Sequence, residues 1–299
     1  MDYRESIVSL WPRILYPEAR YRFKKRIHPV SVKKRLQDAP TSFVDPWAFI
    51  RVKNERCTLL SSLRSILPVI KKGVIAYNDC SDGSDRIILD FCRDNPGFIP
   101  FHYPHDVVPA GDLRYRDDLP FENTLAGYYT AALGCIPSNE WIIKIDVDQV
   151  YFPEILRHSF SLPRAEDDFV IYSRLDLVYE STTNHDLKVW RYHRPGDHWL
   201  IFNKNLRFVN NFGYHRNGRF YAYEVLKCGN ASFPKGRRYL PECSTLHFPT
   251  IKSYRKTTMK VDDLVDWDVW MQKAGDQEFS DIVKSKENAL RILESFDWS

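Results

Sequence analysis

The stretch Trp141-Ile142-Ile143-Lys144-Ile145-Asp146-Val147-Asp148 is the part of the sequence that decides the fold. A largely apolar run is followed at once by two aspartates. Such a run predicts a central strand of a parallel sheet, because that kind of strand is buried on both faces. Ligands of open α/β sheets bind beyond the carboxyl ends of the strands, so the two aspartates are expected at a binding site.

Strands and helices are predicted to alternate on the N-terminal side of this strand. This order predicts an α/β fold with a mostly parallel central sheet and helices on both faces. Short strands are predicted in the second half, within polar loops that could hold an acceptor, and the last forty residues are predicted to be helical. The predicted strands are 47–52, 73–78, 98–103, 141–145, 169–173, 199–202 and 246–248, and the predicted helices are 55–70, 84–92 and 125–133.

Three predicted strands end in polar clusters, at residues 53–55, 78–84 and 146–148. Because the carboxyl ends of parallel strands meet at one edge of a sheet, these clusters should converge on one crevice. Asp79 and Asp82 could accept hydrogen bonds from a nucleobase or a ribose hydroxyl, and Gly83 permits a tight turn. Helix capping by Asp82 or Ser84 is the alternative.

The pair Asp146 and Asp148 predicts a metal site. Side chains at positions i and i+2 of a strand lie about 7 Å apart, whereas two ligands of one ion lie no more than roughly 4 Å apart. Either the strand breaks into a turn here, or one carboxylate binds through water or holds ribose. Carboxylate oxygens favour Mg²⁺ or Mn²⁺ over zinc, and either ion would neutralise a departing nucleoside diphosphate.

Composition indicates one large domain or two joined halves, because the chain has 299 residues, 43% of them hydrophobic, and a net charge of +4. The six cysteines show no C-x-x-C spacing, so reduced cysteines and no zinc site are expected. No apolar run reaches transmembrane length and no secretory leader is evident, which predicts a cytoplasmic protein.

Residues 20–35 carry eight basic residues and no acidic ones, with apolar residues interleaved. Such a segment can lie on an anionic membrane surface, and we predict a peripheral position on the inner face of a bacterial inner membrane. A solvated arm and a nucleic-acid patch are the alternatives, and we expect no nucleic-acid partner.

Three stretches closely resemble bacterial lipooligosaccharide β-1,4-N-acetylgalactosaminyltransferases: PWAFIRVKNE (46–55), GVIAYNDCSDGS (73–84) and EWIIKIDVD (140–148). The similarity is continuous from about residue 45 to about residue 180. Beyond that it is confined to short islands at residues 173–176, 195–197, 242 and 247–249.

This resemblance implies a GT-A fold, a UDP-sugar donor, a divalent metal, inversion at the anomeric carbon and an outer-core glycolipid acceptor. It implies that Asp146 and Asp148 hold metal and ribose, and that His247 is a third protein ligand or a phosphate contact. The residues expected beside the nucleotide are Arg51, Asn54, Glu55, Asp79, Asp82 and Asp146.

Inversion needs a general base beside the attacking hydroxyl, and Asp197 and Glu242 are the candidates. Asp197 is preferred, because Pro195-Gly196 makes a turn that could aim it and an aromatic residue follows closely. A surface ion pair is the alternative for either carboxylate. The basic residues that could steady a phosphate or an anionic acceptor are Arg174, Arg191, Arg194, Lys252 and Arg255.

The predicted organisation is a basic, membrane-associating extension (1–42), a nucleotide-sugar-binding half (43–165), an acceptor-binding half (166–260) and a C-terminal helical segment (261–299). The predicted function is metal-dependent transfer of N-acetylgalactosamine or a related hexose from a UDP-sugar to lipooligosaccharide, lipopolysaccharide or another surface glycan. An aspartate-nucleophile phosphatase and a non-catalytic carbohydrate-binding relic are the alternatives. A nucleotidyltransferase would have a Gly-rich, lysine-bearing phosphate loop, which this sequence does not show.

Overall fold

The computed structural model describes most of the chain from residue 27 onward. Within its strands it describes only the backbone of residues 194–196, 211–216 and 219–223. The described residues are 27–37, 40, 42–109, 112, 114–116, 118–179, 187–216, 219–229, 234–251, 263–275 and 278–298.

Four parallel strands form the part of the sheet that the sequence predicts. They lie in the order β5-β2-β3-β4, with β2 (Trp47–Val52) between β5 (Trp141–Asp146) and β3 (Lys72–Tyr77), and with β4 (Phe98–His102) beyond β3. The predicted central strand is confirmed, since Ile142, Ile143 and Ile145 are fully buried. Because these four strands are parallel, their carboxyl ends all lie at the same edge of the sheet.

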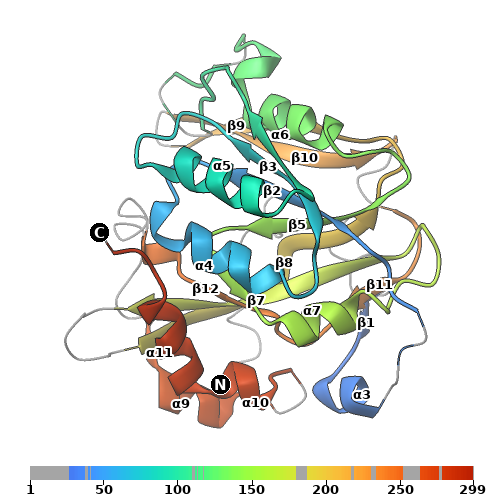
Figure 1. The fold of residues 1–299 in the computed structure, drawn as a ribbon, viewed down its shortest axis with the longest axis vertical. Helices are drawn as coiled ribbons and strands as arrows, with labels where there is room; N and C mark the ends of the chain where they lie inside the picture. Colours follow the sequence, from blue (N-terminus) through green and yellow to red (C-terminus); the bar gives the residue numbers. More distant parts are fainter. Residues whose placement is uncertain are drawn as a thin grey trace.

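Helices cover both faces of this sheet (Figure 1). On one face, α4 (Arg56–Ile66), α5 (Ser84–Asp94) and α7 (Pro153–Ser159) share a core with Ile50 and its neighbours. On the other face, α6 (Leu125–Gly134) and the hairpin β9 (Leu206–Arg216)–β10 (Arg219–Cys228) pack with Phe49. Alternation along β2 therefore sends successive apolar side chains into two different cores.

The second half contains long strands where the sequence predicted short ones within loops. β7 (Phe169–Tyr179) and β8 (Leu187–Phe202) are antiparallel partners, and β8 also pairs with β5. The predicted limits 169–173 and 199–202 are therefore wrong, because charged residues interrupt the apolar pattern of strands that border a polar site. The shorter strands of the same sheet are β1 (Ile27–Pro29), β6 (Gln149–Tyr151), β11 (Arg238–Leu240), β12 (Thr245–His247) and β13 (Val265–Asp266).

The C-terminal segment is helical, as predicted. Its helices α9 (Trp267–Lys273), α10 (Asp281–Lys284) and α11 (Lys286–Glu294) form a third core with β7, β8 and β12. The remaining elements are α3 (Val32–Gln37) and the 3₁₀ turns η1 (Phe121–Asn123) and η2 (Pro249–Ile251). Among the described residues, none of the helices combines the length and the apolar character needed to cross a membrane. All six cysteines are free thiols.

Candidate functional site

The two predicted aspartates lie on either side of a strand break. β5 ends at Asp146, residues 147–148 form a turn, and β6 begins at Gln149. The Tyr151 hydroxyl closes this turn, since it accepts from the Asp146 N–H (2.9 Å) and donates to the Asp146 carbonyl (3.2 Å). Of the two geometries open to the sequence, the structure adopts the break into a turn. The side chains of Asp146 and Asp148 consequently meet different partners.

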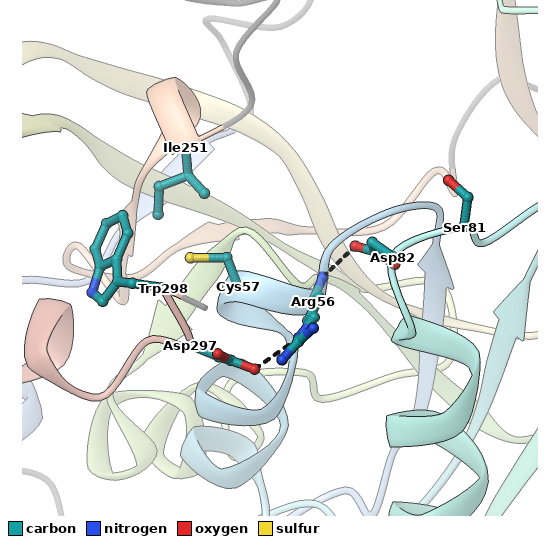
Figure 2. A pocket seen from close by; sticks show the side chains of 7 residues that line it. All are labelled: Arg56, Cys57, Ser81, Asp82, Ile251, Asp297 and Trp298. Carbon is teal, nitrogen blue, oxygen red and sulfur yellow. Dashed lines mark hydrogen bonds and ion pairs between the residues drawn. The ribbon is translucent and has the colours of Figure 1, made fainter.

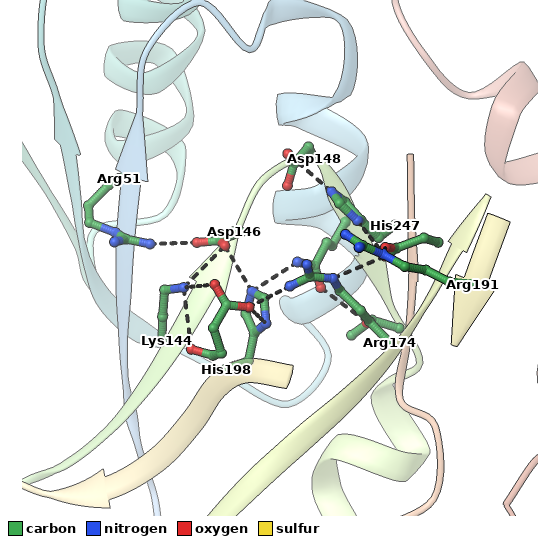
Figure 3. A network of polar contacts seen from close by, with 12 residues as sticks. Arg51, Lys144, Asp146, Asp148, Arg174, Arg191, His198 and His247 are labelled. Atoms are coloured by element: carbon green, nitrogen blue, oxygen red, sulfur yellow. Dashed lines mark hydrogen bonds and ion pairs between the residues drawn. The ribbon is translucent and has the colours of Figure 1, made fainter. Parts of the chain in front are cut away.

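Asp146 lies at the centre of a cationic group (Figure 3). Its carboxylate accepts from Arg51 at 2.5 Å and from Lys144 at 3.3 Å, and it lies 2.9 Å from Nε2 of His198. Burial alone would raise the pKa of Asp146, but Lys144, His198 and Arg51 hold it well below its usual range. Asp146 therefore stays ionised and firmly oriented.

Asp197, the preferred base of the sequence prediction, belongs to the same group. Its carboxylate lies 3.1 Å from Lys144 Nζ and 3.2 Å from His198 Nδ1, and it also accepts from Arg174. Although partial desolvation opposes ionisation, Lys144, His198 and Arg174 hold the pKa of Asp197 well below its usual range. A carboxylate in this state binds cations well but accepts a proton weakly.

Asp146, Asp197 and His198 could together hold a metal ion. Each offers one ligand atom, and these three atoms all lie within 4.8 Å of one another. The Lys144 ammonium, however, contacts both Asp146 and Asp197, and it already neutralises part of their charge. An ion bound by this trio would therefore have to compete with Lys144.

Asp148 and His247 form a second pair of candidate ligands. Asp148 Oδ2 lies 3.3 Å from His247 Nε2, within the roughly 4 Å that separates two ligands of one ion. The other ring nitrogen, Nδ1, lies 2.7 Å from the carboxylate of Asp176. Burial opposes protonation of His247, but Asp148 and Asp176 raise its pKa. One nitrogen and one carboxylate oxygen at this spacing fit a divalent cation.

The loops after β2 and β3 meet beside this edge, as the sequence predicted. The Asn54 side chain accepts from the Ser81 N–H at 2.7 Å, and Ser84 Oγ accepts from the Glu55 N–H at 2.9 Å. Asn54 and Asp79 adopt left-handed backbone conformations, with φ of 54° and 43°. Such conformations at non-glycine residues are concentrated at functional sites. Asp79 is half exposed and pairs with Lys53 at 3.3 Å.

Asp82 hydrogen bonds to the backbone at the beginnings of two helices. Oδ2 accepts from the Arg56 N–H, while Oδ1 accepts from the N–H and the hydroxyl of Ser84. Burial opposes ionisation of Asp82, but these hydrogen bonds lower its pKa. Gly83, which lies between Asp82 and Ser84, has a φ of 88°. Of the two predicted roles for Asp82, the contacts favour helix capping.

A pocket of about 500 Å³ opens next to these loops (Figure 2). The Trp298 indole and Ile251 lie on one side of it, and Ser81 and Asp82 lie on the other. Arg56, Cys57 and Asp297 complete the lining, and Arg56 pairs with Asp297 at 2.9 Å. An aromatic face beside charged groups suits a ring that carries hydroxyl or amide groups.

Glu242, the second predicted base, contacts a different part of the molecule. It is buried and accepts from Arg35 of α3. Burial raises its pKa, while Arg35 opposes that rise. Arg35 also lies 3.8 Å from Glu154 of α7. Glu242 therefore ties α3 to the body of the protein.

Sequence reasoning missed several site residues that lie inside strands. Lys144, Asp176 and His198 carry most of the polar contacts, but each is a single charge in an otherwise apolar or mixed run. Glu224 of β10 is another, because burial raises its pKa and it is electrostatically coupled to Arg51 and Lys144. The alternation of charged and buried residues along β7 and β8 could have indicated Asp176 and His198. The side chains of Arg194, Lys252 and Arg255 lie outside the described residues.

Comparison with known proteins assigns the family. No curated protein matches the chain. A solved inositol-1-phosphate CTP transferase from T. maritima matches with 9% identity over 55% of this chain and 72% of that chain, at a TM-score of 0.29. The family model described as beta-1,4-N-acetylgalactosaminyltransferase (CgtA) matches residues 32–288. The chain, with its paired aspartates at the end of β5, belongs to this family of glycosyltransferases.

Proposed function

We propose that this protein is a metal-dependent, inverting glycosyltransferase with a GT-A fold. It transfers N-acetylgalactosamine or a related hexose from a UDP-sugar to lipooligosaccharide or another surface glycan. The observation that carries the proposal is the pairing of Asp148 with His247 at 3.3 Å, in the turn that follows Asp146 and at the edge where β2 and β5 end. Family membership supports the reaction class, and the site chemistry supports the donor and the metal.

The donor nucleotide would bind along the loops that contain Asn54, Glu55 and Asp79. Asp79 is exposed enough to accept a hydrogen bond from a base or a ribose hydroxyl, whereas Asp82 supports the loop from behind. The adjoining pocket offers the Trp298 indole as a stacking surface. Arg51 would act indirectly, by holding Asp146.

A divalent cation, Mn²⁺ or Mg²⁺, would be held by Asp148 and His247, with Asp146 bound to it directly or to ribose. When bound, it neutralises the charge that develops on the departing nucleoside diphosphate. Asp148 and His247 already lie at ligand spacing. An ion held by Asp146, Asp197 and His198 would have to displace Lys144, which contacts both carboxylates.

The acceptor hydroxyl must lose its proton while the sugar bond forms. Asp197 remains the base that we propose from the sequence, and its contacts with Lys144, Arg174 and His198 would position it rather than make it basic. Glu224 is the alternative that the structure adds, because burial raises its pKa and its electrostatic neighbours belong to the same group. Glu242, bonded to Arg35, is less well placed.

We also propose that the enzyme works as a peripheral protein on an anionic membrane, where its glycolipid acceptor lies. In α3, Lys33 and Lys34 are exposed and Leu36 is 71% exposed, while Arg35 points inward to Glu242. Exposed basic and apolar side chains on one short helix suit an anionic lipid surface.

One experiment separates this function from its alternatives. A panel of UDP-sugars is screened for thermal stabilisation and slow hydrolysis, with Mn²⁺ and with EDTA. A true donor at 100 times its Kd should add about 2.7 kcal/mol to the free energy of unfolding. Hydrolysis of p-nitrophenyl phosphate without any UDP-sugar response would instead indicate a phosphatase. Carbohydrate binding without donor hydrolysis or transfer would indicate a relic.

A further inference from the structure

Asp176 is a fully buried carboxylate whose contacts the predicted functions do not use. Its side chain has 0% exposure and three basic neighbours. Oδ1 lies 2.7 Å from His247 Nδ1 and 3.0 Å from Arg174 Nε, and Oδ2 lies 2.6 Å from Arg191 Nε. A buried charge at such a position is costly unless it is fully paired, and here it is.

Backbone pairing fixes Asp176 relative to two of these partners. His247 of β12 is its register partner on one side of β7, and Arg191 of β8 is its register partner on the other. Arg174 lies two residues before it on β7. Because three adjacent strands hold the group, Asp176 cannot move away from the imidazole without disturbing the sheet.

We infer that Asp176 is a positioning residue that accepts a hydrogen bond from the Nδ1–H of His247 and so directs Nε2 toward Asp148 as a cation ligand. The inference rests on the proposed function only in the choice of cation, a divalent metal such as Mn²⁺. The atoms are arranged for it, because Nδ1 is 2.7 Å from Asp176 while Nε2 is 3.3 Å from Asp148. Imidazole ligands commonly donate their second N–H to a carboxylate, which sets both tautomer and ring orientation.

The two arginines explain why Asp176 orients a ligand instead of binding the cation. Arg174 and Arg191 each occupy one carboxylate oxygen, and the side chain has no exposed surface. Arg174 additionally contacts Asp197, so it links Asp176 to the Asp146 group. Asp176 therefore influences a cation through His247 and not by contact.

The test compares Mn²⁺ binding by the full chain and by Asp176→Asn, using electron paramagnetic resonance of free Mn²⁺. We expect about 10–100-fold weaker binding by the variant. Asp168→Asn is the matched control, since Asp168 is a buried carboxylate that accepts from the Arg164 and Arg237 N–H groups, away from His247. Its Mn²⁺ affinity should equal that of the wild type. Equal affinity in folded Asp176→Asn, or no Mn²⁺ binding by the wild type, would overturn the inference.

A second measurement needs no variant and covers the case in which Asp176→Asn fails to fold. The ¹⁵N shifts of His247 in the wild-type protein, recorded above the pH at which it titrates, should show the proton on Nδ1. A proton on Nε2 would overturn the inference. Metal-independent glycosyl transfer, with weakened Mn²⁺ binding in Asp176→Asn, would instead count against the proposed function alone.

Discussion

Arg51 and Asp146 are register partners in neighbouring parallel strands, and their side chains form an ion pair of 2.5 Å. The Arg51 guanidinium also lies 4.0 Å from the centre of the Tyr129 ring. Burial opposes its charge, yet Tyr129 and Asp146 raise the pKa of Arg51. One strand thus holds the first aspartate of the pair, while the turn that follows sends Asp148 toward His247.

Metal removal should abolish sugar transfer, and Asp148→Ala should do the same while the protein stays folded. Loss of charge neutralisation worth several kcal/mol corresponds to about 10²-fold or more in rate. His247→Ala should behave similarly. Asp90→Ala, on the exposed face of α5, is the control and should be fully active. Full activity in excess EDTA would exclude a metal requirement.

Asp197→Asn should lower kcat by about 10²-fold or more with little change in UDP-sugar affinity, because a positioned carboxylate contributes about 10²–10⁴-fold. Glu242→Gln should be milder, since Glu242 is paired with Arg35.

The pH profile of kcat distinguishes Asp197 from Glu224. The pKa of Asp197 is well below its usual range, so an Asp197 base predicts a rate that holds down to acidic pH. The pKa of Glu224 is raised, so a Glu224 base predicts a rate that falls earlier as the pH is lowered. If Glu224→Gln loses the fall of kcat at acidic pH and lowers kcat more than Asp197→Asn does, Glu224 is the general base.

Asp82→Ala should lower stability more than it weakens donor binding. Its carboxylate satisfies N–H groups at the beginnings of α4 and α5, and loss of a cap costs about 0.5–2 kcal/mol. Asp79→Ala should do the reverse, because Asp79 is half exposed and pairs with the half-exposed Lys53. Urea unfolding and UDP titration of the two variants give both quantities. A stable Asp82→Ala protein that no longer binds UDP would show that Asp82 contacts the nucleotide instead of capping the helices.

Asp176→Asn should destabilise the protein by about 3–5 kcal/mol at neutral pH, because Arg174, Arg191 and His247 lose the fully buried carboxylate that they share. Burial opposes ionisation of Asp176, but His247, Arg174 and Arg191 lower its pKa. The stabilisation is therefore complete above the pKa of an unfolded aspartate, about 3.9, and is lost as the pH falls below it. Guanidinium unfolding at several pH values should show the two proteins converging in acid. A gap that widens below about pH 4 would contradict this.

Charge reversal at Lys24, Lys25 and Arg26 should release the protein from phosphatidylglycerol vesicles and leave transfer to a soluble acceptor intact. These residues lie outside the described part of the chain. Each basic residue near an anionic surface contributes about 1 kcal/mol at best. Vesicles of phosphatidylcholine are the control. A wild-type protein that ignores anionic vesicles at low salt would show that the basic segment has another purpose.

The elements that the sequence predicts best are those whose signal is local. β2, β3 and β5 are runs of buried apolar residues, and α4 has apolar residues at helical spacing, so each is recognisable without its neighbours. The polar residues at the carboxyl ends of these strands were predicted from the same local pattern, because each polar cluster directly follows an apolar run. Strands β7 and β8 were predicted too short, because their charged residues face a site that the rest of the fold creates.

By itself, the sequence determined the mostly parallel strands of the first half, the polar edge where those strands end and the aspartates at the end of β5. The tertiary structure decided which partners those aspartates meet. Arg51 and Asp146 are 95 positions apart, and His247 and Asp176 are 71 positions apart. No local periodicity encodes such pairs, because they arise only when strand register and a turn at residues 147–148 bring distant charges together in a buried region where each must find its counter-charge.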